Sequence, residues 1–180
     1  MILKKILINL ITFLFVVNQY QVGNTIQYSK PIAINPHSFV AHFNCGNALH
    51  ELKSLAEAVA SYDRAIDINP HYAIAHINRG NALQDLKRFE EAIDSYDRAI
   101  EINPLYADAY FNKSLALLLL GDFETGWKLY EWRWKRDTFE SHKRNFSQPL
   151  WLGVEDISGK TILLHAEQGL GDTIQFCRYA

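Results

Sequence analysis

The chain has 180 residues, of which 48% are hydrophobic, and its formal net charge is −2. This near balance of charge implies no polyanion partner. The two cysteines, Cys45 and Cys177, lie in unrelated segments, so the sequence contains no disulfide framework and no paired-cysteine metal motif. A reducing compartment is therefore expected.

The chain begins with an apolar segment, Ile6–Val17, that follows two lysines. Twelve residues are too few to span a bilayer comfortably, although a charged start followed by an apolar run is typical of a signal peptide. The phase of the repeats described below favours a different interpretation, in which residues 5–38 form a degenerate repeat whose second helix is broken by Pro31. We therefore expect a cytoplasmic protein; membrane association or export through the apolar segment is the alternative.

The tripeptide Ile-Asn-Pro occurs three times at a spacing of 34 residues, at 34–36, 68–70 and 102–104. Residues 35–68 and 69–102 agree at 21 of 34 aligned positions. Because a helix does not continue through proline, each copy is predicted to be a pair of helices followed by a loop. A fixed period of this length predicts a solenoid in which neighbouring copies bury a common core.

Small and aromatic residues recur at fixed places in these copies and match the consensus of one repeat family. They are Gly46, Ala58, Tyr62, Ala65 and Pro70 in the first copy and Gly80, Ala92, Tyr96, Ala99 and Pro104 in the second. The chain thus resembles tetratricopeptide repeat proteins. The resemblance implies antiparallel helix pairs whose first helices line a concave groove that holds another protein.

The third copy, residues 103–136, departs from this pattern. It keeps Tyr130 but places Ser114 at the glycine position and Gly126 and Arg133 at the two alanine positions. Such a departure is typical of a last repeat whose outer face meets something other than another repeat. The tryptophans of this copy, interspersed with basic residues, predict an amphipathic capping helix.

Asparagines recur on the expected first helices at two positions three residues apart, which share one face of a helix. The first position holds Asn44, Asn78 and Asn112, and the second holds Asn47 and Asn81. Because an amide side chain offers donors and an acceptor, such rows could bind the backbone of an extended peptide without reading its sequence. The pattern resembles the asparagine ladder of O-linked N-acetylglucosamine transferases. The alternative is that these asparagines bond to neighbouring helices and fix the array.

An apolar position beside the asparagines recurs as Phe43, Ile77 and Phe111. These three residues form either a stripe in the groove or part of the core. A Lys/Arg clamp for a C-terminal carboxylate is not visible in the sequence. The partner expected from these positions is another protein or an extended peptide.

Histidines recur at the repeat period as His42 and His76, but Tyr110 takes the same place in the third copy, which indicates packing. No set of four ligands appears at zinc spacing, so we expect structural histidines, no metal and no cofactor. The repeats also lack a basic stripe with interleaved aromatic residues, so no nucleic-acid partner is expected.

The composition changes after Arg136. A polar linker leads to residues 158–160, which predict a turn, and then to the apolar run 161–165, which predicts a short strand. A glycine-rich turn follows, and residues 173–180 have the pattern of a helix start. Strand, glycine-rich turn and helix together form the first unit of an α/β domain.

The stretch Pro149–Phe176 resembles bacterial tetratricopeptide proteins with a C-terminal glycosyltransferase domain, which is similar to the heptosyltransferases. The resemblance implies that Asp172 is the base that activates the acceptor and that Gly169 and Gly171 shape its loop. A tight turn with Asp172 as a helix N-cap is the alternative. Only the first strand and helix of that domain are present, without a lobe to bind the sugar donor. We therefore expect no enzyme activity from this chain alone and interpret it as a fragment.

Together these patterns predict an all-α solenoid of tetratricopeptide helical hairpins, followed by a short βα fragment of a truncated α/β domain. The expected divisions are a degenerate repeat or apolar leader at 1–38, three repeats with a capping helix at 39–136, a linker at 137–157 and the βα fragment at 158–180. The predicted function is to bind a peptide or partner protein in the groove. The alternative is the N-terminal part of a glycosyltransferase that uses a nucleotide sugar donor.

Overall fold

The computed structural model describes residues 32–33, 35–136, 151 and 156–161, and these residues contain helices but no strand. The chain divides into two compact units, Met1–Arg133 and Trp134–Ala180, and each is described by itself. The helices are α2 (Phe39–Glu51), α3 (Leu55–Ile68), α4 (Ala73–Asp85), α5 (Phe89–Ile102), α6 (Ala107–Leu120), α7 (Phe123–Tyr130) and the short 3-10 helix η1 (Glu131–Lys135).

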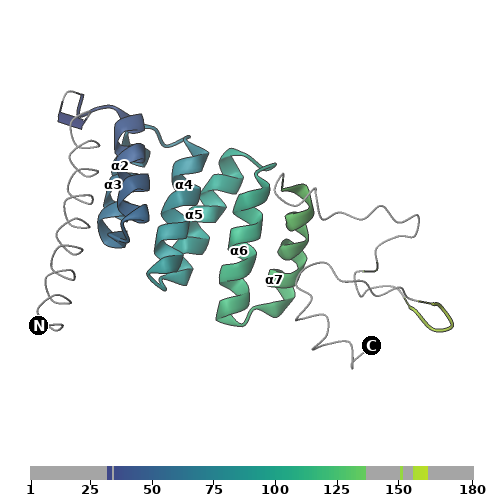
Figure 1. Ribbon diagram of the computed structural model, residues 1–180. Helices are drawn as coiled ribbons and strands as arrows, with labels where there is room; N and C mark the ends of the chain where they lie inside the picture. Colours follow the sequence, from purple (N-terminus) through teal and green to yellow (C-terminus); the bar gives the residue numbers. More distant parts are fainter. Residues whose placement is uncertain (1–31, 34, 137–150, 152–155, 162–180) are drawn as a thin grey trace, which may run out of the picture. The chain divides into compact units, whose positions relative to one another are not determined.

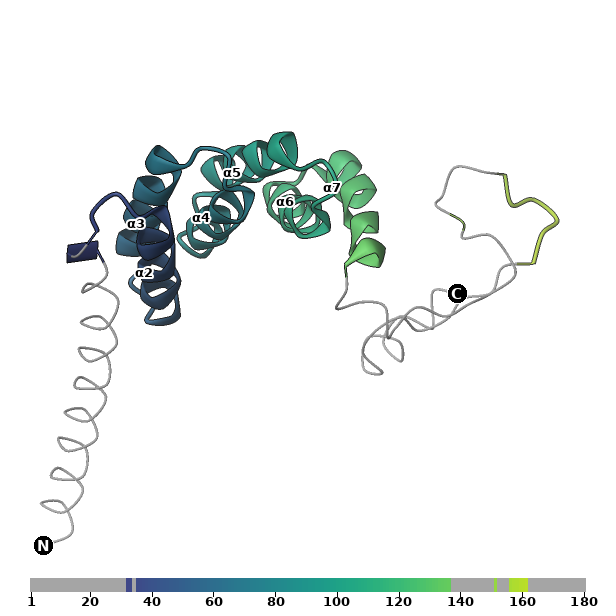
Figure 2. The ribbon, with the colours of Figure 1, turned by 90° about the horizontal axis from the view of Figure 1, so that it is seen from above.

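Consecutive helices pair as α2 with α3, α4 with α5 and α6 with α7, and each pair packs on the next through α3–α4 and α5–α6. Figure 1 shows the pairs following one another in chain order. In Figure 2 the first helices, α2, α4 and α6, form one row and the second helices form another. The three antiparallel pairs predicted for residues 39–136 are confirmed, with helix breaks at Pro70 and Pro104.

Each helix pair turns through one residue in the left-handed region of backbone conformation. Lys53 (φ 62°), Lys87 (φ 64°) and Gly121 (φ 88°) occupy this position. In each turn the next N–H reaches back to a carbonyl of the first helix, as from Ser54 N to Leu49 O at 2.9 Å, which closes the helix end. Glycine adopts this conformation freely, whereas a lysine carries a steric cost of about 1–2 kcal/mol.

The recurrent Ile-Asn-Pro loops owe their asparagine to a local hydrogen bond. In each loop the asparagine Oδ1 accepts the backbone N–H two residues further on, which satisfies the chain as it leaves one helix pair and enters the next. The three bonds are His37 N to Asn35 at 3.2 Å, His71 N to Asn69 at 3.3 Å and Leu105 N to Asn103 at 3.1 Å.

The core of each of the first two pairs is a tyrosine ring laid against a glycine. A Cβ atom at Gly46 would lie 2.5 Å from Cε1 of Tyr62, and one at Gly80 would lie 2.5 Å from Cε1 of Tyr96. Both rings are fully buried. The glycine in the first helix therefore allows close approach of the partner helix, as the sequence pattern predicts.

The third pair ends differently from the first two. Helix α7 has 8 residues, against 14 in both α3 and α5, and it continues as the 3-10 helix. Arg133, in that 3-10 helix, takes the place of the fully buried Ala65 and Ala99 and is itself buried. A side chain of this volume does not fit where a methyl group fits, which explains why the regular helix stops early.

The described part of the C-terminal unit is short. The turn predicted at residues 158–160 is present, with Gly159 at φ 72° and Lys160 N donating to Ile157 O at 3.0 Å. The predicted strand and helix after Thr161 lie outside the described residues, as does most of the degenerate repeat at 5–38. Among the described helices, none has the length and apolar character needed to cross a membrane.

Replacing Gly80 by Ala should destabilise the array, although alanine favours a helix over glycine by about 1 kcal/mol. The added methyl group would overlap the buried ring of Tyr96, and overpacking of this kind costs about 1–3 kcal/mol. Because the ring of Tyr96 is fully buried, we expect a net loss of about 1–2 kcal/mol in urea denaturation. Glu57→Ala, at an exposed position of α3, is the control and should change stability by less than about 0.5 kcal/mol. A stabilised Gly80→Ala variant would contradict this packing.

Candidate functional site

The two predicted asparagine rows lie along the first helices of the array. Asn44 is exposed, whereas Asn47, Asn78, Asn81 and Asn112 are half-buried. Because α2, α4 and α6 stand in one row (Figure 2), an asparagine of one repeat can reach an asparagine of the next.

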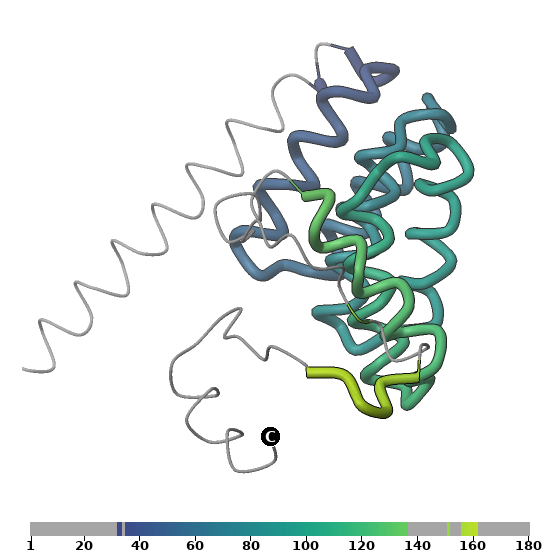
Figure 3. The backbone as a smooth tube through the Cα atoms, turned by 90° about the vertical axis from the view of Figure 1, so that its right-hand side faces the viewer, coloured from purple at the N-terminus to yellow at the C-terminus, as the bar shows by residue number. Residues whose placement is uncertain are grey.

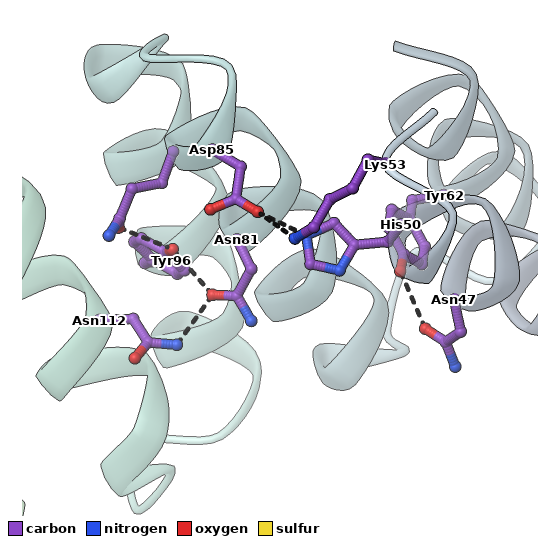
Figure 4. A network of polar contacts seen from close by, with 9 residues as sticks. Asn47, His50, Lys53, Tyr62, Asn81, Asp85, Tyr96 and Asn112 are labelled. Atoms are coloured by element: carbon purple, nitrogen blue, oxygen red, sulfur yellow. Dashed lines mark hydrogen bonds and ion pairs between the residues drawn. The ribbon is translucent and has the colours of Figure 1, made fainter. Parts of the chain in front are cut away.

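A carbonyl shared by two donors links one repeat to the next. Asn47 Oδ1 accepts a hydrogen bond from Asn78 Nδ2 at 2.8 Å and another from the hydroxyl of Tyr62 at 2.9 Å. The link therefore joins the tyrosine of one helix pair to the first helix of the following pair. The same link recurs one repeat later between Asn81, Asn112 and Tyr96, again at 2.8 and 2.9 Å, as Figure 4 shows.

These links use only part of the hydrogen-bonding capacity of the asparagines. Within the described part of the chain, the Nδ2 groups of Asn47 and Asn81 and the Oδ1 atoms of Asn78 and Asn112 form no hydrogen bond. Each half-buried pair thus keeps donors and an acceptor on the first-helix row. Fixing the array and offering polar groups to a ligand are compatible roles for the same side chains.

The tyrosine hydroxyls remain protonated donors. Burial raises the pKa of Tyr62 and of Tyr96 well above the usual value for a phenol, because the charged form would lose its hydration. The link between repeats therefore does not titrate near neutral pH.

A second link between repeats is ionic. Arg79 Nε lies 2.6 Å from Asp63 Oδ1, and one repeat later Lys113 Nζ lies 2.5 Å from Asp97 Oδ1. These pairs were not predicted from the sequence, although a cation follows an Asp at the same separation of 16 residues in two consecutive copies, which was a signal for them. Arg79 and Lys113 are also the only Lys or Arg residues on α2, α4 and α6, so the described first helices present no uncommitted cation.

A third contact connects the first two repeats at the turn of the first pair. Asp85 Oδ2 lies 3.2 Å from His50 Nε2 and 3.7 Å from Lys53 Nζ (Figure 4). These side chains are partly exposed to solvent, so each pair contributes at most about 1 kcal/mol.

The predicted apolar stripe is divided between core and surface. The structure places Phe43 and Ile77 in the buried core. Phe111 is half-buried, and its ring centroid lies 5.4 Å from that of Tyr130. Phe43 and Ile77 therefore support the first helices from behind and are not available to a ligand.

The recurrent histidines hold the loops. His42 Nε2 lies 3.0 Å from Pro36 O, and His76 Nε2 lies 3.0 Å from Pro70 O. Tyr110, at the same place in the third copy, stacks on Trp132 with centroids 3.7 Å apart. Among the described residues there is no group of three or more His, Cys, Asp or Glu that could hold a metal ion.

The residues implied by the glycosyltransferase resemblance, namely Asp172, Gly169 and Gly171, lie outside the described residues. Nothing in the described geometry bears on their predicted roles.

Comparison with protein families identifies the repeats. A tetratricopeptide repeat model matches residues 73–106, a TPR repeat model matches 46–87, and a further tetratricopeptide repeat model matches 95–128. Comparison with curated proteins gives no match.

Solved structures agree in fold. The crystal structure of MamA is similar with a TM-score of 0.60 and 22% identity, over 64% of this chain and 68% of that chain. The first TPR of Spaghetti (RPAP3), bound to the HSP90 peptide SRMEEVD, is similar with a TM-score of 0.54 and 25% identity, over 56% of this chain and 79% of that chain.

The repeat unit is thus a tetratricopeptide helical solenoid, a class of protein-interaction module. More particularly, it consists of three tetratricopeptide helix pairs, α2–α3, α4–α5 and α6–α7. The comparisons give no support to the glycosyltransferase resemblance.

Asn47→Ala should cost more stability than Asn81→Ala. Each change removes a carbonyl that accepts a buried tyrosine hydroxyl, but Tyr96 has a second acceptor, Gln84 Oε1 at 3.2 Å. Tyr62 has no second acceptor among the described residues. An unsatisfied buried hydroxyl costs about 1–3 kcal/mol, so urea denaturation should show a loss of about 2 kcal/mol for Asn47→Ala and about 1 kcal/mol for Asn81→Ala.

Asn44→Ala is the matched control, because Asn44 is exposed and forms no hydrogen bond within the described residues. Its stability should stay within about 0.5 kcal/mol of the wild type. Equal losses of stability for the changes at Asn44, Asn47 and Asn81 would mean that the hydrogen bonds to the shared carbonyl do not stabilise the array.

His76 should make the array less stable in mild acid. Burial lowers the pKa of its imidazole, so the unfolded chain takes up a proton before the folded chain does. His76 therefore contributes its full stabilising free energy at pH values above about 6.5, the pKa of histidine in the unfolded chain. This contribution is lost progressively as the pH falls below that value. His76→Gln, which keeps a donor for Pro70 O, should lose less stability than the wild type between pH 7.5 and pH 5.5 in urea denaturation. An equal loss in both proteins would show that other groups carry the pH dependence.

Proposed function

We propose that the repeat unit binds an extended segment of another protein along the row of first helices. The observation that supports this proposal is the set of unused donors and acceptors on the asparagine pairs Asn47–Asn78 and Asn81–Asn112. An extended peptide carries alternating N–H and C=O groups, which is the complement of amide groups repeated along a solenoid. Recognition of this kind holds a backbone and is tolerant of side-chain sequence.

The charges of the first helices indicate which ligands fit. Arg79 and Lys113 are held by Asp63 and Asp97, so the described first helices have no cation left to bind a carboxylate. Glu51 is exposed on α2. The proposed ligand is therefore an internal segment of a protein that is neutral or basic, rather than an acidic C-terminus.

A peptide-bound neighbour of the same fold supports the mode of binding but differs in ligand chemistry. The TPR of RPAP3 is bound to SRMEEVD, a peptide with two adjacent acidic residues near its end. Carboxylates of that kind call for cations, since charge-assisted hydrogen bonds are the strong ones. This chain presents none free on its described first helices, so we expect it to prefer other sequences.

Asn44→Ala should weaken peptide binding without altering the fold. Peptides selected from a random display library on the immobilised chain are the probes, and fluorescence anisotropy measures their dissociation constants. Loss of one or two neutral hydrogen bonds should raise the dissociation constant roughly two- to tenfold, with an unchanged thermal melt. Glu57→Ala, on the second-helix row, is the control and should bind like the wild type.

The same assay tests the charge argument. SRMEEVD and its C-terminal amide should bind equally weakly, within about twofold of each other. Selected peptides that require a free C-terminal carboxylate, or that bind Asn44→Ala as well as the wild type, would contradict the proposed mode.

A further inference from the structure

Helix α7, which is the second helix of the third pair, exposes two large aromatic side chains. Phe123 and Trp127, four residues apart on α7 and hence on one side of it, are 60% and 57% exposed. These two side chains form the end face of the array. Figure 3 views the array from this end, with α7 in front of the earlier helices.

The Trp127 side of the end face corresponds to a surface that is covered in the first repeat. Trp127 lies 68 residues, or two repeat lengths, after Val59 of α3, and Val59 is only 7% exposed. One turn beyond Val59, Asp63 binds Arg79 of α4, so this side of α3 faces the next first helix. The end face is therefore the side of α7 on which a further helix would pack.

Another tetratricopeptide repeat does not fit there, because both polar links are closed off. Leu115 replaces the asparagine that shares its carbonyl in the first two repeats. Glu131, at the place of Asp63 and Asp97, is already paired with Arg133 Nη1 at 2.6 Å. Of the two positions that would bond to a following repeat, Leu115 is therefore apolar and Glu131 has its charge already neutralised.

Head-to-tail stacking of a second copy fails for the same reason. In that arrangement Asn44 of α2 would meet Leu115, and Cys45, at the place of Arg79 and Lys113, would meet Glu131. Neither pair can form the hydrogen bond or ion pair that joins successive repeats. The remaining way for two copies to associate at this end is through contact between their two end faces.

The charges around the end face suit that arrangement. Glu124 and Lys128 both lie along one side of the aromatic pair, are exposed, and pair within α7 at 2.9 Å. If two α7 helices lie antiparallel about a twofold axis, Glu124 of each copy faces Lys128 of the other. In a parallel arrangement the Glu124 and Lys128 side chains of the two copies would lie on opposite sides of the interface and would not meet. The surface is therefore complementary to itself in one orientation.

We infer that the chain forms a symmetric dimer through antiparallel packing of α7 on α7, with Phe123 and Trp127 buried at the centre. This inference does not depend on the proposed peptide binding. The first-helix row, which uses α2, α4 and α6, stays free in such a dimer.

Light scattering after size exclusion and sedimentation equilibrium of the full chain test the dimer. The wild type should show a mass that rises toward twice the chain mass with concentration. Trp127→Glu should be monomeric throughout that range, with a helical circular dichroism spectrum like that of the wild type. Leu105→Glu is the matched control, because Leu105 is 82% exposed in the loop between α5 and α6, and it should dimerise normally.

Charge reversal identifies the orientation. Glu124→Lys alone and Lys128→Glu alone should each raise the dimer dissociation constant by about tenfold or more, because like charges then face each other. Mixing the two variants should restore association, since every pair across the axis is again opposite in charge. A structural defect in α7 would not be repaired by mixing.

Three results would overturn the inference. A wild type that is monomeric at all concentrations would mean that the chain's own residues after Arg136 or a foreign protein covers the end face. A dimer that survives Trp127→Glu would place the interface elsewhere. Failure of the mixed charge variants to associate would exclude the antiparallel twofold arrangement.

Discussion

The array depends on one buried tyrosine in each of its first two helix pairs. The ring of Tyr96 lies against the backbone at Gly80, which sets how closely the two helices of a pair approach. Its hydroxyl donates to Asn81, whose carbonyl also receives Asn112 of the next pair. A single side chain thus fixes both the inside of a repeat and its junction with the following one. The asparagine rows are positioned as a result, because their spacing follows from this junction.

Much of the fold could be predicted because its causes are local and periodic. Proline after Asn69 or Asn103 ends a helix wherever it occurs, and the glycine opposite the tyrosine recurs at the repeat length. One copy of the repeat is therefore enough to predict a helix pair, and the second copy, with the same pattern, supports the prediction independently. The third copy was harder to read in detail, since the effect of Arg133 in an alanine place depends on how much room the surrounding helices leave.

The candidate site was less predictable, because its chemistry arises between repeats. The sequence indicates that Asn47 and Asn78 face the same side, but not that one donates to the other across 31 residues. Which asparagine atoms remain for a ligand follows only from that bond. Likewise, Arg79 has the pattern of a free cation on a first helix until its distance to Asp63 is known. The core positions of Phe43 and Ile77 were one of two alternatives that periodicity alone does not separate.

The left-handed lysine at the first hairpin turn has a meaning beyond its own loop. Glycine, as in the third turn, would relieve the backbone at Lys53 without any steric cost. Glycine would also remove the ammonium group that reaches Asp85 in the neighbouring repeat. Lys87, one repeat later, meets no carboxylate at the corresponding place, which is Leu119, and its ammonium instead lies 6.0 Å from the ring centroid of Phe89. A change that relieves the backbone of the first turn therefore also removes one of the contacts that join the first two repeats.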